Sequence, residues 1–249
     1  MAASFRPLPA LPCPPRQRRA PGRISLFRLL FLPMPDAAPD STAIATPPWW
    51  REACAHLGKK DRVMRRLIPQ YGDACLQSRG NAFVTLARSI VGQQISVKAA
   101  QSVWDRFAAL LAHFTPQDVL QLGADDMRAA GLSARKVEYL RDLASHFAQG
   151  RIIPSQWHAM PDEAIIGELL AIRGIGRWTA EMFLIFHMMR PDVLPLDDVG
   201  LLKGISRNYF GGEPVSRHDV RELARAWQPW RSAATWYIWR SLDPLPVAY

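Results

Sequence analysis

The sequence predicts an all-α protein, and three observations support this fold class. From Trp49 onward, apolar residues recur at the spacing of helix faces. Along the same stretch, residues that start helices (Ser, Thr, Asp and Pro) alternate with glycines that end them. No run alternates apolar and polar residues as a half-buried strand does. We therefore expect about ten helices, in a chain long enough for one large domain or two small ones.

The first expected helices precede residue 112. The sequence Pro47-Pro48-Trp49-Trp50 leads into a helix that extends to His56, and a second helix spans residues 60–68. Residues 82–92 are strongly apolar with helical periodicity. Ser96 then caps a further helix. The shared apolar face of that helix carries Ala100, Val103, Trp104, Phe107 and Leu111.

Further helix boundaries follow from the residues that favour helix ends. Proline is favoured at the first helical position, serine or threonine just before it, and glycine just after the last turn. Accordingly, one helix is expected to end at Gly131 and the next at Gly150. The starts are marked by Thr115-Pro116, Ser133, Pro161-Asp162-Glu163, Arg177, Val199, the Ser216/Asp219 capping box and Pro229. The helix from Val199 is expected to end near Asn208, and the last helix near Ser241.

Residues 1–47 differ in composition from the rest of the chain. They are rich in Pro, Arg and Ala. Residues 1–33 contain six arginines and no acid, so these residues contribute +6 of the formal net charge of +9. Its apolar run, Ile24–Leu32, is interrupted by Arg28 and is too short to span a membrane. We expect a disordered tail, or an upstream extension of a protein that starts at Met34, rather than a transit or signal peptide. The folded domain is then residues 48–249.

Cysteine and charge patterns exclude several classes of site. The three cysteines lie far apart without a Cys-x-x-Cys spacing, and the six histidines are scattered. This pattern excludes a disulfide framework and a four-cysteine iron–sulfur or zinc site within the chain. After residue 33 the chain is only mildly basic, so its net charge does not by itself indicate a nucleic-acid partner.

A Gly-x-Gly turn, Gly174-Ile175-Gly176, joins two expected helices in a hairpin over residues 162–187. Glycine readily adopts the backbone angles of a tight reversal. The N–H groups at the start of the second helix have no intrahelical partner, so they can hold a nucleic-acid phosphate without reading its sequence. The alternative is a helical hairpin whose glycines only permit close packing.

Two acids, Asp197-Asp198, follow this hairpin and a proline-containing connector, where the next helix begins at Val199. A carboxylate there is stabilised in its charged form by the helix N-terminus. Such a group can stabilise an oxocarbenium-like sugar cation, or it can simply cap the helix. We expect Asp197 to be the cap, and on this evidence both roles remain open for Asp198.

Tryptophans crowd the C-terminal helices, and Trp178 lies beside the hairpin glycines. Tryptophans at helical spacing are usually buried, and several of these are expected in the core. A purine extruded from the DNA stack also needs flat apolar walls, and a cationic, alkylated purine gains about 0.5–2 kcal/mol on an aromatic face. The C-terminal aromatic residues are Trp227, Trp230, Trp236, Tyr237 and Trp239.

Five stretches between Asn81 and Trp239 resemble the helix–hairpin–helix (HhH-GPD) superfamily of DNA glycosylases, and within it the compact, all-helical 3-methyladenine glycosylases of type II. They occur in the family's order and cover most of the folded chain. The stretches are Ile90–Ser96, Gly131–Leu140, Leu170–Ala180, Leu194–Leu201 and Trp227–Trp239. The resemblance implies a helix–hairpin–helix glycosylase fold, with two helical subdomains and the active-site cleft between them.

The resemblance also implies roles for individual residues. Asp198 matches the catalytic aspartate, and Gln93-Gln94 lie on the loop that fills the gap left by the flipped nucleotide. The hairpin contacts to DNA would come from Gly174, Ile175, Gly176 and Thr179. The base pocket would include Trp178, Trp239, Met182 and Val199. The candidate ligands of a structural monovalent cation, Na⁺ or K⁺, are the backbone carbonyls of Leu170, Ile172 and Gly174.

Three basic residues are further candidates for phosphate contacts. They are Lys98, Lys203 and Arg207. Each could equally be a solvated surface charge.

Three departures from the family bear on the expected fold and function. Glycosylases that also cut the strand carry a nucleophilic lysine in the hairpin helix, where this chain has Trp178. Without that amine no Schiff base forms, so we expect water to be the nucleophile. Met182 and Val199 stand where some relatives have aromatic residues, which alters the shape of the base pocket. The best-known bacterial relatives also have an N-terminal β-domain, for which no strands are expected here.

The sequence therefore favours a monofunctional glycosylase that flips alkylated purines, such as 3-methyladenine, out of double-stranded DNA and hydrolyses the N-glycosidic bond. We expect it to require no cofactor and no iron–sulfur cluster. We also expect a monomer with no membrane association and no obligate protein partner, located in the cytoplasm at the nucleoid. The alternatives are a non-catalytic hairpin module that binds DNA, a bifunctional oxidised-purine glycosylase/lyase, and a helical adaptor between proteins.

Overall fold

The described residues of this computed structural model, 46–78 and 80–242, form twelve α-helices and three 3-10 helices and contain no strand. The all-α prediction is therefore confirmed. Most of the tail predicted over residues 1–47, including Ile24–Leu32, lies outside the described residues. In the part of the chain that is described, no helix combines the length and the apolar character needed to cross a membrane.

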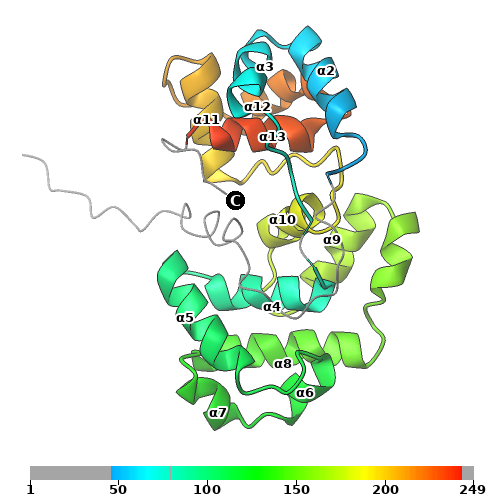
Figure 1. Ribbon diagram of the computed structural model, residues 1–249, viewed down its shortest axis with the longest axis vertical. Helices are drawn as coiled ribbons and strands as arrows, with labels where there is room; N and C mark the ends of the chain where they lie inside the picture. Colours follow the sequence, from blue (N-terminus) through cyan, green and yellow to red (C-terminus); the bar gives the residue numbers. More distant parts are fainter. Residues whose placement is uncertain (1–45, 79, 243–249) are drawn as a thin grey trace, which may run out of the picture.

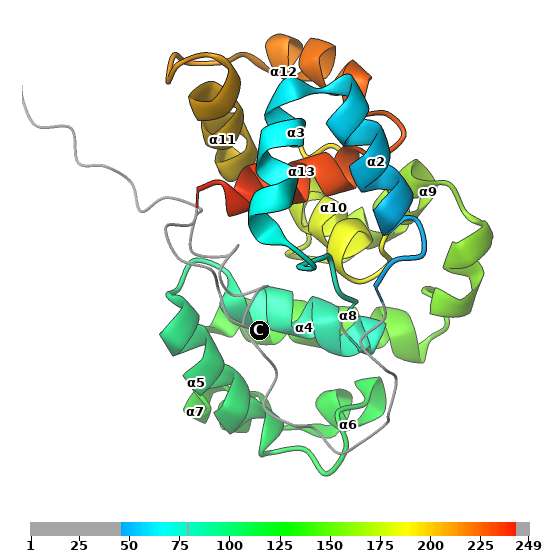
Figure 2. The same cartoon turned by 45° about the horizontal axis from the view of Figure 1, so that its top comes forward.

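The helices form two groups, with two helices between them (Figures 1 and 2). One group contains α4 (Ala82–Gly92), α5 (Val97–Ala108), α6 (Pro116–Gln121), α7 (Ala124–Ala129) and α8 (Ala134–Ala148). The other contains α2 (Trp50–Lys60), α3 (Arg62–Leu67), α11 (Val199–Tyr209), α12 (Arg217–Ala224) and α13 (Arg231–Arg240). The helices between the groups are α9 (Asp162–Leu170) and α10 (Arg177–Phe186), and the 3-10 helices are η1 (Ile68–Tyr71), η2 (Pro154–Ala159) and η3 (Arg225–Trp227). This arrangement matches the two helical subdomains that the sequence predicts.

Side-chain caps set many of the helix starts. Ser96, Thr115 and Ser133 each accept a hydrogen bond from the first turn of α5, α6 and α8, as predicted. Ser216 and Asp219 form the predicted capping box at α12.

Helix bounds differ from the prediction at two places. The first helix, α2, extends beyond His56 to Lys60 and buries Leu57. It ends there because the next residue, Asp61, has an extended backbone. Asp61 accepts hydrogen bonds from the backbone N–H groups of Val63 and Met64, so the second helix starts after it rather than at Lys60. The last helix, α13, starts at Arg231 rather than at Pro229.

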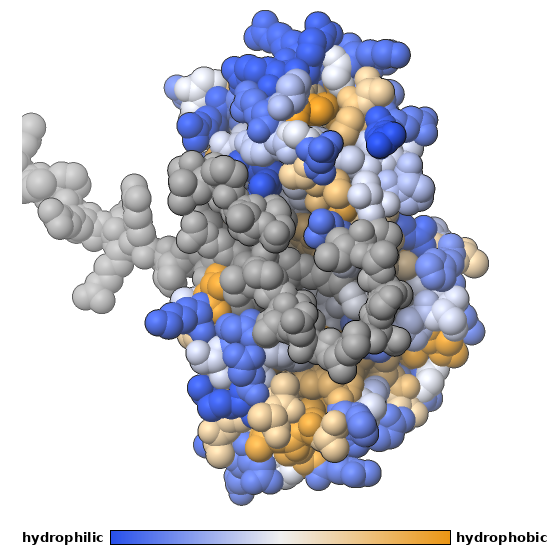
Figure 3. Space-filling model, in the orientation of Figure 1, coloured by the Kyte–Doolittle hydropathy of each residue, from blue (hydrophilic) through white to orange (hydrophobic). Residues whose placement is uncertain are grey.

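The two groups have different apolar centres. In the α4–α8 group, Phe114 stacks on Trp104 and meets Phe83 and Phe107 edge-on or tilted. In the other group, α13 is buried from Ser232 to Arg240 and packs against α2, α3 and α11. Trp227, Trp236, Tyr237 and Trp239 are buried, which confirms that several of the C-terminal aromatic residues belong to the core. Figure 3 shows a mainly hydrophilic surface over much of this second group and an apolar area at the opposite end of the molecule.

A buried carboxylate joins three elements of the second group. Asp61 is 6% exposed, and its Oδ1 caps α3. Its Oδ2 accepts hydrogen bonds from the Tyr209 hydroxyl at 2.8 Å and the Trp227 indole N–H at 2.9 Å. Tyr209 ends α11 and Trp227 ends η3, so Asp61 fixes both elements against α3.

Replacing this carboxylate should destabilise the fold. In Asp61→Ala the partly buried hydroxyl of Tyr209 and the buried N–H of Trp227 lose their acceptor, so we expect a loss of about 3 kcal/mol in the free energy of unfolding. Urea denaturation followed by circular dichroism measures the loss. Asp73→Ala removes the same charge at an exposed position and should change stability by less than about 0.5 kcal/mol. Equal effects of the two substitutions would contradict the structural role of Asp61.

Candidate active site at the hairpin and Asp198

The turn between α9 and α10 needs glycine at one position for two reasons. Gly174 has a φ of +84°, which L side chains rarely adopt. A Cβ there would also lie 2.2 Å from Cδ2 of Tyr139 on α8. Gly176, the residue before α10, has a φ of −96° and open space where a side chain would project. The turn is therefore packed against the protein at Gly174 and open at Gly176.

The start of α10 presents backbone N–H groups that no side chain of the described residues caps. The first turn of a helix leaves its N–H groups without intrahelical acceptors, and the helix dipole favours an anion there. Ile175 and Thr179 are buried, with exposed fractions of 5% and 8%, so their side chains are not available to an external anion. The predicted phosphate contact by this turn stays a prediction.

The hairpin rests on α8 and on the end of α4. Asp142 on α8 accepts a hydrogen bond from the Arg173 backbone N–H at 2.8 Å. The side-chain amide of Gln93, which directly follows α4, donates to the Gly174 carbonyl at 2.7 Å. The turn is therefore held from both sides.

Asp198 lies at the point where α10, α11 and α13 meet. Its Oδ1 accepts hydrogen bonds from the Leu201 backbone N–H at 2.6 Å and the Trp239 indole N–H at 2.7 Å. Its Oδ2 accepts one from the Trp178 indole N–H at 2.8 Å. In all three hydrogen bonds the acceptor is an oxygen of the Asp198 side chain. The three donors fix its orientation.

The prediction that Asp197 caps the helix is wrong. The cap of α11 is Asp198, because its side chain reaches the Leu201 N–H. Asp197 forms an ion pair with Arg217 of α12 instead. Capping and the predicted catalytic role thus fall on the same residue, Asp198, which is 6% exposed.

The four predicted base-pocket residues divide into two kinds. Trp178 is partly exposed and Val199 is 43% exposed, so both present surface beside Asp198. Trp239 and Met182 are each 2% exposed. The ring of Trp239 stacks on Phe186, with the centroids 5.6 Å apart, and its N–H is directed at Asp198. Trp239 therefore acts on this site through Asp198, and its contact with a base stays a prediction.

The remaining predicted DNA contacts lie on two helices and one loop. Gln94 is exposed and has a φ of +61°, in the left-handed region, whereas the side chain of its neighbour Gln93 is held by the hairpin. Lys98 on α5, and Lys203 and Arg207 on α11, are exposed. Exposure permits the predicted phosphate contacts but does not test them.

Two of the three backbone carbonyls predicted to bind a cation already accept hydrogen bonds. The Ile172 carbonyl accepts the Ile175 N–H at 3.1 Å, and the Gly174 carbonyl accepts the amide of Gln93. A carbonyl has a second lone pair, so these contacts do not exclude a cation, but they satisfy both groups without one. The cation stays a prediction. Among the described residues, no three His, Cys, Asp or Glu side chains are grouped as metal ligands would be.

A buried acid near this site was missed by the sequence analysis. Glu181 on α10 is 6% exposed; its Oε1 accepts a hydrogen bond from Arg177 at 3.1 Å, and its Oε2 has no partner among the described residues. Burial is the largest cause that raises the pKa of Glu181 to about 7; Arg177 opposes the shift, and Asp197 and Glu163 add to it. The available signal was an acid between the apolar residues Ala180 and Met182 of a buried helix.

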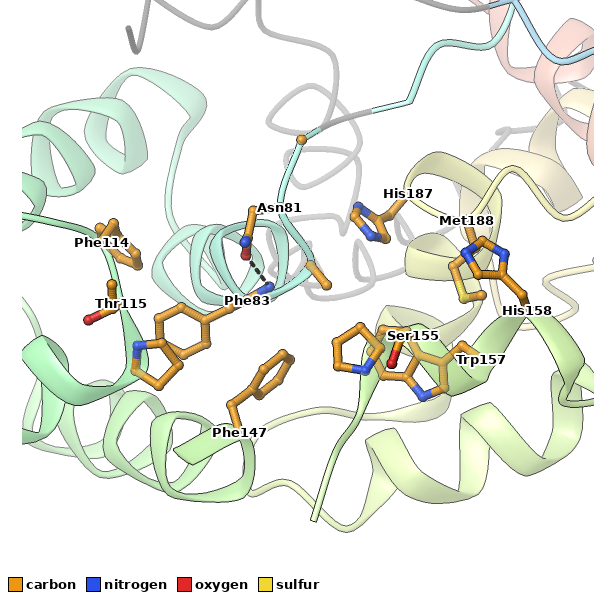
Figure 4. A pocket seen from close by; sticks show the side chains of 14 residues that line it. Asn81, Phe83, Phe114, Thr115, Phe147, Ser155, Trp157, His158, His187 and Met188 are labelled. Atoms are coloured by element: carbon orange, nitrogen blue, oxygen red, sulfur yellow. Dashed lines mark hydrogen bonds between the residues drawn. The ribbon is translucent and has the colours of Figure 1, made fainter. Parts of the chain in front are cut away.

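A separate pocket lies at the other end of α4 (Figure 4). The N-terminal end of α4 contributes to it, about 15 Å along that helix from the Gln93 loop. Asp198 does not line it, and of the hairpin residues 162–187 only the last, His187, does. Side chains around it include Asn81, Phe83, Phe114, Phe147, Trp157, His158 and His187. Because it is remote from Asp198, this pocket is not the predicted base pocket.

A family model described as the HhH-GPD superfamily base excision DNA repair protein matches residues 87–229. The DNA-3-methyladenine glycosylase 1 of Schizosaccharomyces pombe is 31% identical over 194 residues, which cover 75% of this chain and 85% of that protein. The DNA-3-methyladenine glycosylase 2 of Escherichia coli is 30% identical over 173 residues, and the match spans 57% of that protein.

Solved structures show the same likeness. A crystal structure of a DNA-3-methyladenine glycosidase from Bacillus halodurans has a TM-score of 0.72 and 32% identity, and the match covers 81% of this chain and 92% of that one. A 3-methyladenine DNA glycosylase of S. pombe, in complex with abasic DNA, has a TM-score of 0.66 and 31% identity, with coverage of 76% and 96%.

The buried acid Glu181 should make stability depend on pH. Its folded pKa is about 7 and its ordinary value is 4.5, so between these values the folded protein binds more protons at this group than the unfolded protein does. Its contribution to stability therefore falls as pH rises from 4.5 to 7 and is constant above, by at most about 3 kcal/mol. Glu181→Gln should remove this dependence.

The measurement is the free energy of unfolding of both proteins at pH 5, 6, 7 and 8. All other titrating groups are shared, so the difference between the two curves isolates Glu181. The variant should gain stability relative to the wild type as pH rises. Parallel curves across this range would show that Glu181 does not titrate there.

Proposed function

The chain belongs to the HhH-GPD superfamily of base excision DNA repair proteins, and from this membership and the geometry around Asp198 we infer that it is a DNA glycosylase acting on alkylated purines. The proposed reaction is hydrolysis of the N-glycosidic bond, with 3-methyladenine as the representative lesion. The observation that carries the proposal is a buried carboxylate, fixed by two indole N–H groups, at the start of α11 and in contact with the hairpin helix α10.

The hairpin is proposed to bind the DNA backbone. The open backbone at Gly176 and the uncapped start of α10 suit a phosphate, which binds through N–H groups whatever the base sequence. Trp178 is the second residue of the same helix and contacts Asp198. A phosphate held at the start of α10 would therefore be placed close to the reacting sugar.

Asp198 is proposed to stabilise the positive charge that develops on the sugar as the base leaves. A fixed carboxylate in a site that excludes water stabilises such a charge more strongly than a mobile, hydrated one. An alkylated purine already carries positive charge and leaves without strong acid assistance. Water then adds to the sugar, and the products are the free base and an abasic site.

Gln94 is the residue that we assign to the gap left by the flipped nucleotide. Its side chain is exposed, whereas the amide of Gln93 is bonded to Gly174. The partly exposed ring of Trp178 and the exposed Val199 are proposed to line the base pocket. An aromatic face would favour a cationic purine by about 0.5–2 kcal/mol.

The chemistry is proposed to be monofunctional. The position at which the resemblance implies a nucleophilic lysine holds Trp178, whose indole N–H is committed to Asp198. We propose that hydrolysis requires no cofactor, and that a hairpin cation, if bound, is structural. The partner is double-stranded DNA carrying alkylated bases; a cytoplasmic, nucleoid-associated location follows from that substrate.

Asp198→Asn tests the catalytic assignment. An amide cannot accept at both former oxygen positions and carries no charge, so we expect the single-turnover rate of 3-methyladenine release to fall at least about 100-fold. Binding to a duplex with an abasic-site analogue should change by less than about threefold. Chromatography of released base and fluorescence anisotropy measure the two quantities.

The matched control is Asp197→Asn, which removes the neighbouring charge and its pair with Arg217. It should retain base release within about threefold. Full activity of Asp198→Asn would refute the assignment. Base release by neither the wild type nor the control, with binding intact, would instead indicate a different lesion or a non-catalytic DNA-binding module.

Trp178→Phe distinguishes the contribution of the indole N–H from that of the aromatic ring. The substitution keeps an aromatic face but removes the donor to Oδ2 of Asp198, so we expect base release to slow about 10- to 100-fold while the KM changes by less than about threefold. Trp230→Phe is the control, because Trp230 stacks on Trp49 at 5.8 Å and has no contact with Asp198. A change confined to the KM would show that Trp178 acts only as a pocket wall.

A further inference from the structure

We propose that Gln93 is a positioning residue whose side-chain hydrogen bond links the Gln94 loop directly to the hairpin and so couples the two DNA-contacting segments. The inference rests on the proposed function, because it concerns how the glycosylase holds its DNA. It assigns the paired glutamines different tasks: Gln93 faces the protein and Gln94 faces the DNA.

The coupling contact joins segments that are far apart in the sequence. The side-chain amide of Gln93 donates to the Gly174 carbonyl at 2.7 Å, and the two residues are 81 positions apart. Gln93 is partly buried and is the C-cap residue of α4, with its backbone N–H donating to the Ile90 carbonyl. Its side chain therefore extends from a fixed backbone position to the centre of the hairpin turn.

Residues of helix α8 contact both segments that this hydrogen bond joins, the end of α4 and the hairpin turn. Lys136 donates through Nζ to the Val91 carbonyl at 2.7 Å, which fixes the last turn of α4. Tyr139 packs beneath Gly174, and Asp142 accepts the Arg173 N–H at 2.8 Å. Lys136, Tyr139 and Asp142 recur every three residues and so lie along one face of α8. The Gln93 hydrogen bond therefore joins the end of α4 to the hairpin turn, and one face of α8 contacts both of these segments.

The backbone of Gln94 shows what the coupling has to maintain. Its φ of +61° is unusual for a residue other than glycine, and such a conformation persists where the surrounding structure fixes it. The preceding residue is fixed by the Gly174 contact, and two residues later Ser96 caps α5. Gln94 is thus the exposed tip of a short loop that is fixed on both sides. Loss of the Gln93 contact would free one side.

A double-mutant cycle tests the coupling. The four proteins are the wild type, Gln93→Met, Gln94→Ala and the double variant. Methionine keeps the approximate volume of glutamine, adds no charge and cannot donate to Gly174. The measurements are affinity for a duplex with an abasic-site analogue and the single-turnover rate of 3-methyladenine release.

We expect Gln93→Met to weaken abasic-site binding about tenfold in the wild-type background and less than about twofold in the Gln94→Ala background. Once the Gln94 side chain is removed, the position that Gln93 gives to the loop no longer affects binding. Gln77→Met makes the same exchange at an exposed position ahead of α4 and should change affinity by less than about twofold. Equal losses in both backgrounds would overturn the proposal, since Gln93 would then act independently of Gln94.

Two further readouts keep the outcomes distinct. Thermal unfolding of Gln93→Met should match that of the wild type within a few degrees; if the variant does not fold, Gln93→Asn, whose amide is too short to reach Gly174, takes its place in the cycle. Non-additive binding without base release would support the coupling and refute the proposed chemistry. Base release with additive binding would do the reverse, and absence of DNA binding in the wild type would overturn both.

Discussion

The carboxylate of Asp198 is the point on which the site depends. One oxygen accepts from the backbone of α11 and from Trp239 on α13, and the other accepts from Trp178 on α10. A buried charge is stable only where donors surround it, so moving any of these three helices would leave the charge or a donor unpaired. Gly200 permits the arrangement, because a Cβ at that position would lie 3.3 Å from the ring of Trp239. The bonds that pack the helices are therefore the bonds that hold the chemical group.

Helix α11 is fixed by a buried carboxylate at each end. Asp198 caps its N-terminus, and Tyr209 at its C-terminus donates to Asp61, which also accepts the N–H of Trp227. In both places an indole N–H satisfies a buried acid, so Trp227 and Trp239 each provide a polar contact as well as apolar packing. The position of Asp198 is consequently set by the packing of the group formed by α2, α3 and α11–α13. The position of the hairpin turn is fixed by the other group, through contacts with α8. Helix α10 connects the turn to Asp198 through Trp178.

Local signals in the sequence were sufficient for most helices and for the hairpin turn, whereas the choice of Asp198 as the catalytic candidate came from the family resemblance. Caps and glycines act within a few residues, so Ser96 and Gly174 could be interpreted without knowledge of the fold. Contacts between distant segments could not. The bond from Gln93 to Gly174 and the burial of Glu181 within α10 depend on which helices pack together. The pairing of Asp197 with Arg217 on α12, while Asp198 caps α11, likewise involves segments that are distant in the sequence.

The geometry of the carboxylate also bears on where the reaction occurs. A carboxylate has about four lone-pair directions, two on each oxygen. Oδ1 of Asp198 accepts two N–H groups, whereas among the described residues Oδ2 accepts only the N–H of Trp178. The remaining acceptor direction is therefore on Oδ2, and Trp178, the donor to that oxygen, is the partly exposed one of the two tryptophans. In the proposed reaction, the sugar cation or the attacking water would meet Asp198 at Oδ2. In the proposed reaction Trp178 thus has two tasks, to present a ring face to the base and to direct the single unused acceptor position of the carboxylate toward the sugar.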